Sequence, residues 1–426
     1  MSVNQFALLK SRRFAPLFIT QFLGAFNDNV FKNALVMLIT YRIANDLGHN
    51  AQILVTLAAG LFILPFFLFS AMAGQVADKY ERSHLIRIIK LAEIIIMLLA
   101  SAGLYFQSTF FLMLVLFLLG IQAAFFGPIK YAILPDLLQK TELIAGNGLI
   151  EAGTFLSILI GTIVGGLLIL LPWGNHLVSV AICVLSLLGF VSSLFIPKTD
   201  IKNLSMVLRY NFLSETVRVI NYSREHRTIF RCIFGISWFW LVGSIFLAEL
   251  PVFAKDILHA NEHVVTFFMA TFSIGIGIGS LLCNRLSNGH INMTYVRLGA
   301  VGISIFILDL YFAASQVSKS PVNNLIGLTE FLHTFGGWRI TFDLILIAVN
   351  GGLFTVPLYA MLQIHSEPSH RARVIASNNV INALFMVIAA ITTIIMLNAG
   401  FRVTDIFLVT AILNSLVAIY IYKLRS

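Results

Sequence analysis

The chain has 426 residues, of which 58% are hydrophobic and 11% charged, and its formal net charge is +9. Soluble domains are about 45–50% apolar and about 25% charged, so this composition excludes a soluble enzyme, a secreted disulfide scaffold and a nucleic-acid binder. A membrane-crossing helix takes roughly 20 apolar residues, and the unbroken apolar runs also exclude a transmembrane β-barrel, whose strands alternate. The sequence therefore predicts an all-α integral membrane protein.

Apolar runs between polar breaks predict twelve transmembrane helices. Six are expected in the first half, at 14–42, 53–76, 84–106, 109–134, 143–171 and 177–197, and six in the second, at 228–254, 263–284, 295–316, 339–364, 374–398 and 403–422. A polar stretch between the halves, 198–227, is typical of a partly helical surface linker. We therefore expect two six-helix halves, 1–197 and 228–426, joined by this linker.

The distribution of basic residues predicts the orientation. Twenty-one of the 28 Lys and Arg residues fall on the side of the two termini and the linker, five fall on the opposite side, and Lys32 and Lys130 lie inside spans. By the positive-inside rule, both termini and the linker are expected in the cytoplasm. The surplus of positive charge is thus explained by topology.

The sequence also repeats itself. Residues 144–152 and 375–383 are identical at five of nine positions, at a fixed offset of 231, and 128–134 resembles 357–362 with one residue deleted. Because the copies lie six spans apart, both cross the membrane in the same direction. Such a parallel repeat is typical of a two-halved transporter whose substrate path follows the interface between the halves.

The segment after the second predicted span carries a known signature. Residues 74–82 read G-Q-V-A-D-K-Y-E-R, which resembles the G-x-x-A-D-[RK]-x-x-R loop of the major facilitator superfamily. The resemblance implies the twelve-helix major facilitator fold with alternating access. It also implies that Gly74, Asp78, Lys79 and Arg82 control the conformational change, with the glycine allowing close helix approach and the charges pairing with neighbouring helix ends.

Further motifs resemble the lysophospholipid transporter family. They lie at 21–29, 127–134, 147–152, 237–240 and 356–363 and together span essentially the whole chain. The family implies a monomeric transporter of the bacterial inner membrane that moves lysophospholipids inward and supplies an acyltransferase.

The chain departs from some members of that family, which carry a basic residue midway along the seventh span. Here Gly243 and Ser244 occupy that place, with Glu249 following, as in the transporter half of longer proteins fused to an acyltransferase. The H-x-x-x-x-D signature of those acyltransferases follows none of the ten histidines. Reacylation is therefore expected from a separate cytoplasmic partner.

Charged residues inside predicted spans are the main candidates for a binding site, because a charge at the bilayer centre costs about 2.5–3.5 kcal/mol on insertion scales. Asp28 and Lys32 lie four residues apart on one helix face and are expected to pair. Lys130 and Glu151 lie in the fourth and fifth spans. These charges are expected to converge, either on a substrate or in a structural salt bridge between helices.

A zwitterionic lipid headgroup matches these residue types. A phosphate requires positive charge and hydrogen-bond donors, which Lys130, Asn29 and Asn147 can supply. An ammonium group requires a carboxylate, from Asp28 or Glu151. Further residues are expected along the cavity that holds the acyl chain: Lys32, Phe26, Tyr131, Trp240, Glu249 and Asn378.

Other polar residues in the spans are expected to be structural. Lys90 and Glu93 are predicted to pair and extend to the membrane surface, while Asp309 has no evident role. The three cysteines stand singly and the histidines lack a partner set, so we expect no metal site, disulfide or cofactor.

Two other functions fit the same sequence. One is a proton-coupled exporter of drugs or siderophores, in which Asp28 or Glu151 carries the proton. The other is a membrane scaffold that docks an acyltransferase through residues 198–227. An integral-membrane enzyme is disfavoured, because the spans show no nucleophile–base pair and no set of metal ligands.

Overall fold

The computed structural model describes residues 4–40, 50–200, 206–209, 211–315 and 325–422. Within these ranges twelve helices have 20 or more residues, which confirms the predicted all-α membrane fold. They are α1 (Ala15–Leu38), α3 (Asn50–Lys79), α4 (Arg82–Phe106), α5 (Thr109–Ala132), α7 (Leu143–Leu170), α8 (Gly174–Leu194), α10 (Arg227–Val252), α11 (Glu262–Ser287), α12 (Met293–Ser315), α14 (Phe335–His365), α15 (Arg371–Asn398) and α16 (Val403–Tyr422).

Ten of these helices, all except α1 and α4, are long and apolar enough to cross a membrane, by length and composition. The two exceptions have the length but are rich in polar and charged side chains, among them Asp28 in α1 and Lys90 in α4. The helices that the hydropathy criterion misses are thus those that combine several charged and polar side chains, whereas α5 and α7 meet it with few such residues.

The structure adjusts several predicted boundaries. The predicted span 14–42 ends in residues that lie outside the described ranges. The signature 74–82 was expected to be a loop, but α3 continues to Lys79 and α4 begins at Arg82, so only Tyr80 and Glu81 lie between the helices. Glu81 caps α4 by accepting hydrogen bonds from the backbone N–H groups of Ser83 and His84.

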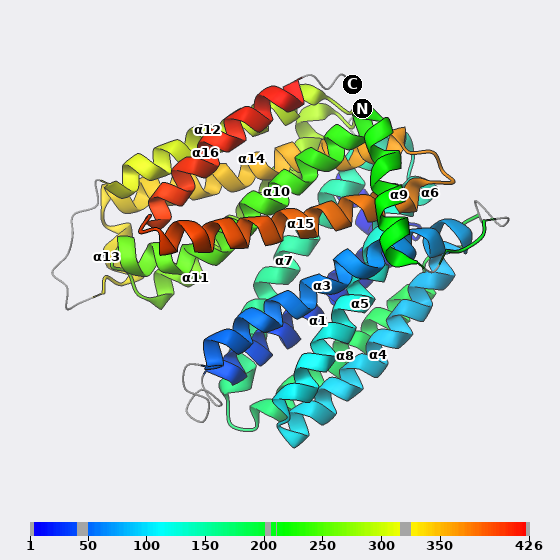
Figure 1. The fold of residues 1–426 in the computed structure, drawn as a ribbon, viewed down its shortest axis with the longest axis horizontal. Coiled ribbons are helices and arrows are strands. Elements are labelled where there is room, and N and C mark those ends of the chain that lie inside the picture. Colours follow the sequence, from blue (N-terminus) through cyan, green and yellow to red (C-terminus); the bar gives the residue numbers. More distant parts are fainter. Residues whose placement is uncertain (1–3, 41–49, 201–205, 210, 316–324, 423–426) are drawn as a thin grey trace.

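Figure 1 shows the long helices in two groups. The amino-terminal group contains α1, α3, α4, α5, α7 and α8, and the carboxyl-terminal group contains α10, α11, α12, α14, α15 and α16. The groups meet near the short helices α6 (Leu134–Leu137) and α9 (Phe212–Glu225), at what we call the linker end, and diverge toward the opposite, far end. Their closest packing is between α3 and α15 and between α7 and α11.

Helix α9 lies within the predicted linker and packs on both groups, against α3 and α15. Its buried side chains are Glu215, Thr216, Val219 and Ser223, whereas Leu213 and other residues of the opposite face are exposed. Residues 201–205 and 210 of the linker lie outside the described ranges.

Candidate functional site between the two helix groups

The structure places Asp28, Lys130 and Glu151 on α1, α5 and α7 of the amino-terminal group, with Glu151 buried and the other two half-buried. The three helices are neighbours, since α1 packs against both α7 and α5. None of the three forms an ion pair within 4.0 Å in the described part of the chain. The structural salt bridge that the sequence allowed is therefore not formed.

Each of these three groups keeps bonding capacity. Asp28 Oδ1 and Glu151 Oε2 are buried without a hydrogen-bond partner among the described residues. The Tyr131 hydroxyl donates to Glu151 Oε1, and Lys130 Nζ lies 4.9 Å from the centre of the Tyr131 ring. Buried polar atoms are normally paired, so these atoms favour a polar ligand in the interior.

Three other predicted site residues use their polar atoms elsewhere. Lys32 does not pair with Asp28, and its Nζ lies 4.3 Å from the ring centre of Phe62 on α3. Asn29 Nδ2 donates 2.7 Å to the carbonyl of Ala25 in its own helix. Asn147 is fully buried and bonds across the interface. In this conformation, Lys130 and Lys32 each lie against an aromatic ring and form no ion pair in the described part of the chain, so both ammonium groups are available to a phosphate.

Asn147 forms an amide pair between the two helix groups. Its Nδ2 donates 2.8 Å to Gln363 Oε1 on α14, and Gln363 Nε2 donates 3.0 Å back to Asn147 Oδ1. Gln363 Nε2 also donates 3.1 Å to the carbonyl of Tyr131. The sequence prediction did not name Gln363 as a site residue, although it ends the family motif 356–363 and directly follows the repeated segment 357–362.

An aromatic stack joins the groups beside this amide pair. The rings of Tyr131 and Tyr359 lie 4.3 Å apart and 5° from parallel. These tyrosines occupy matching places in the two sequence repeats, so the stack brings like positions of the two halves face to face. Trp240 Nε1 donates 3.2 Å to the Tyr359 hydroxyl, and Phe155 stacks on Trp240. The predicted cavity residues Tyr131 and Trp240 thus belong to one buried cluster.

The remaining predicted cavity residues are more scattered. Asn378, on α15, is fully buried. Phe26 is half-buried on α1, in a row of phenylalanines with Phe22. Glu249 lies near the far end of α10, 7% exposed, with Oε2 unpartnered among the described residues.

The signature residues close the linker end between the two groups. Asp78, at the end of α3, accepts hydrogen bonds from the backbone N–H groups of Ala372 (2.9 Å) and Arg373 (3.2 Å) at the start of α15, and from Arg373 Nε (3.1 Å). A carboxylate at a helix N-terminus also interacts favourably with the helix dipole. At Gly74, a Cβ atom would lie only 2.7 Å from that of Ala376, so the glycine permits this contact.

Arg82 extends the closure through Asp136 on α6. Arg82 pairs with Asp136 at 2.6 Å and with Asp78 at 3.4 Å, and Arg371 of the other group pairs with Asp136 at 3.4 Å. The predicted control residue Lys79 instead lies 5.7 Å from the Tyr80 ring centre. The role of Asp78 and Arg82 in the conformational change stays a prediction, and the sequence analysis did not name Asp136 and Arg371, which lie outside the signature.

The linker is attached to the same region. Thr199 donates two hydrogen bonds of 2.9 Å to Glu81. Burial alone would raise the pKa of Glu81, but the hydrogen bonds from Thr199 and Ser83 outweigh it and lower this pKa below its usual value. Gln75 exchanges hydrogen bonds with the backbone of Arg209.

The prediction for Lys90 and Glu93 was half right. They pair, with 2.6 Å between Nζ and Oε2, but they are 0% and 1% exposed and do not reach the membrane surface. Gln122 Nε2 (2.9 Å) and Asn27 Nδ2 (3.1 Å) also donate to Glu93. These four polar residues come from three packed spans, and their presence in apolar helices was the sequence signal for a buried cluster.

Asp309 now has a partner. Arg339 at the start of α14 donates to both of its carboxylate oxygens, at 3.1 and 2.5 Å. This pair is partly exposed and lies toward the far end of the carboxyl-terminal group.

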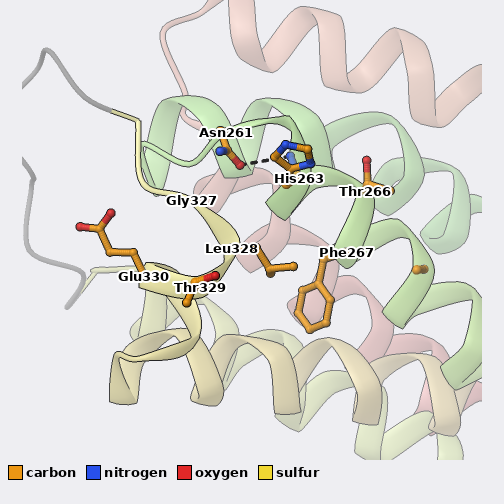
Figure 2. A pocket seen from close by; sticks show the side chains of 9 residues that line it. Asn261, His263, Thr266, Phe267, Gly327, Leu328, Thr329 and Glu330 are labelled. Atoms are coloured by element: carbon orange, nitrogen blue, oxygen red, sulfur yellow. Dashed lines mark hydrogen bonds between the residues drawn. The ribbon is translucent and has the colours of Figure 1, made fainter.

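A surface cleft of about 710 Å³ also lies at the far end, between α11 and the short helix α13 (Leu328–Leu332). Figure 2 shows Phe267 and Leu328 at its floor and Asn261, His263 and Glu330 around it. The cleft does not include any of the charged residues described above.

The chain belongs to the major facilitator superfamily, because the sequence pattern of the Major Facilitator Superfamily matches residues 17–335. It is a multi-pass membrane protein of a family of transporters.

Among curated proteins, it is similar to the lysophospholipid transporter LplT. It is 28% identical to LplT of Escherichia coli O7:K1 over 374 residues, 86% of this chain and 84% of the relative. LplT of Shigella boydii serotype 18 matches with the same identity and coverage. The motif-based resemblance to lysophospholipid transporters is thus confirmed over most of the chain.

Solved structures share the fold. A bacterial homologue of the iron transporter ferroportin in an outward-facing state has a TM-score of 0.71 and 14% identity, and the match covers 96% of this chain and all of that one. The transporter FucP in the outward conformation has a TM-score of 0.73 and 12% identity, over 97% of this chain and 99% of the other.

Proposed function

We propose that this protein moves lysophospholipids inward across a bacterial inner membrane by alternating access and releases them to a separate acyltransferase. The observation that carries the proposal is that Asp28, Lys130 and Glu151 form no ion pair in the described part of the chain, while Asp28 Oδ1 and Glu151 Oε2 are buried there without a hydrogen-bond partner. Isolated charges in hydrocarbon are costly, so a function that brings complementary charges explains their presence.

A zwitterionic headgroup supplies both complements. Its phosphate fits the Lys130 ammonium as a charge-assisted hydrogen bond, and its ammonium fits the free oxygen of Asp28 or Glu151. The half-buried Phe22 and Phe26 on α1 offer apolar surface for a single acyl chain. The similarity to LplT supports the same substrate class.

The closed linker end supports the proposed inward direction of lysophospholipid transport. Asp78, the Arg371–Asp136 ion pair and the Asn147–Gln363 pair join the groups there, while the helices diverge at the far end. With the orientation that the positive-inside rule predicts, this conformation faces outward. A lysophospholipid then enters from the outer leaflet, and the interface opens at the linker end to release it to the cytoplasm.

Uptake of labelled lysophosphatidylethanolamine into spheroplasts tests the proposal. Cells making the wild-type chain should accumulate the label above the empty vector. Asp28→Asn and Lys130→Ala should each reduce uptake at least tenfold, because each loses a charge-assisted bond of about 1.5–3 kcal/mol. Asp309→Asn is the matched control, since it removes a carboxylate from a helix without touching the proposed site.

Uptake equal to that of the vector would refute the lysophospholipid assignment. Adding a protonophore distinguishes the alternative of a proton-coupled exporter, because proton-driven export should stop when the proton gradient is removed. Binding of an acyltransferase with no uptake would favour the scaffold alternative.

A further inference from the structure

Lys90 and Glu93 form a buried ion pair on α4. Three donors from three helices bond the Glu93 carboxylate: Lys90 on α4, Gln122 on α5 and Asn27 on α1. Each ion of such a pair loses several kcal/mol of hydration, so a buried salt bridge is weak evidence for stability. Two ionised side chains at 0% and 1% exposure therefore call for a role beyond holding α4 in place.

Lys90 lies against the helix face that carries Asp28. A Cβ atom at Gly24 would collide with Lys90 Nζ, so the ammonium sits directly beneath this glycine. Asp28 is four residues further along α1 on the same face, a rise of roughly 6 Å. The flexible stem of a lysine allows its ammonium to swing over such a distance.

The pair also lies close to Asp28 along α1, because Glu93 accepts a 3.1 Å hydrogen bond from Asn27, the residue next to Asp28. Lys90 Nζ also lies 5.1 Å from the ring centre of Phe126, and its ion-pair partner in the described chain is Glu93. Glu93 therefore holds one cation that would otherwise be available to Asp28.

We propose that Glu93 restrains Lys90 and thereby sets headgroup preference, keeping the Asp28 carboxylate available for the ammonium of an ethanolamine headgroup. This inference rests on the proposed function. Without the negative charge at position 93, Lys90 turns to Asp28 and competes with the substrate ammonium. A glycerol headgroup has no positive charge, so its lysophospholipid loses nothing by that change.

A competition assay tests the inference. Lysophosphatidylethanolamine and lysophosphatidylglycerol of the same acyl chain are labelled differently and supplied together to proteoliposomes containing the full chain. For Glu93→Gln, we expect the ethanolamine-to-glycerol ratio of kcat/KM to fall about tenfold, the size of one lost charge-assisted interaction. Uptake of the glycerol lipid should stay within about twofold of wild type, as should both lipids with the control Asp309→Asn.

Two further variants separate this role from a structural one. Lys90→Gln added to Glu93→Gln should restore the ethanolamine preference, because it removes the competing ammonium. Gly24→Ala keeps every charge and displaces the flexible end of Lys90, so it should shift the ratio in the same direction as Glu93→Gln, even if the latter folds poorly.

The outcomes are distinguishable. Equal loss of both lipids in Glu93→Gln, or no restoration in the double variant, would overturn the role of Glu93 and leave the proposed function intact. Wild-type uptake of both lipids at the level of empty liposomes would refute the proposed function, and this inference with it.

Discussion

The two helix groups share a sequence repeat but differ in the charge of their interiors. Near the Tyr131–Tyr359 stack, the amino-terminal group holds Lys130 and Glu151. The repeat counterpart of Glu151 in the carboxyl-terminal group is the neutral Asn382, which accepts a 2.7 Å hydrogen bond from Ser237. Matching positions of the two repeats thus carry a charged side chain in one group and a neutral side chain in the other.

This difference indicates a division of labour. Beside the tyrosine stack, the charged residues lie in the amino-terminal group, where they can select a headgroup, and the carboxyl-terminal group contributes the neutral Asn382 and the ring of Trp240. If both sides were charged, opposite charges of the two groups would pair whenever the interface closed, and that pairing would compete with substrate.

The largest expected effect comes from substituting, one at a time, the two residues that occupy matching positions in the sequence repeat. Glu151→Gln should lower lysophospholipid uptake at least tenfold, because it removes a charge from the proposed site. Asn382→Ala, its counterpart, should change uptake less than about threefold, since only the bond to Ser237 is lost. Comparable losses in the two variants, measured at equal expression, would contradict the asymmetry.

A smaller effect is expected at the linker end, where the groups also contribute unequally. Asp78 supplies the carboxylate and α15 supplies the backbone N–H groups. Asp78→Asn should weaken the closed linker end by about 1–3 kcal/mol, because uncompensated donors remain. Alkylation of Ala376→Cys from that end should become faster in this background. An unchanged rate would show that the Arg371–Asp136 ion pair suffices to keep the end closed.

The smallest effect concerns pH, through His370 in the loop before α15. Its ring stacks on Tyr222 of α9 at 5.1 Å, and burial, aided by the charge of Arg373, lowers its pKa below the usual value. The lowered pKa means that the neutral ring is favoured in the packed state. The stabilising contribution is therefore full above the ordinary histidine pKa of about 6.5 and is lost as pH falls through the lowered pKa.

Hydrogen exchange of α9 measures that contribution. We expect protection of α9 to decrease between pH 7.5 and 5, and His370→Gln to remove most of this dependence. The same pH dependence in His370→Gln would assign it to other groups at the linker end.

Much of this arrangement follows from the sequence, because apolar runs and the signature 74–82 are local patterns. They predicted the long helices, and they singled out Asp78, whose carboxylate meets the start of α15 in the structure. The partners of Asp78 were not predictable, since Arg373 and Asp78 meet only through tertiary packing across 295 residues. The same holds for Asn147, which was expected to bind phosphate but bonds Gln363, 216 residues away.

The error at Lys90 has a different cause. Lys90 is the ninth residue of α4, close enough to the helix end to suggest that its side chain reaches the membrane surface. Whether it does depends on which way that helix face points, and α4 turns Lys90 toward Gly24 of α1. Hydropathy indicates how deep in the membrane a residue lies, but it does not show whether that side of the helix faces lipid or another helix.

Because Gly24 is a glycine, its position constrains which residues can occupy position 90 in homologous chains. The space beneath it is filled by the ammonium of Lys90, so neither position is free to vary alone. Homologous chains that bear a larger residue in place of Gly24 should carry a shorter one in place of Lys90, and the pair should covary across an alignment deep enough to detect it.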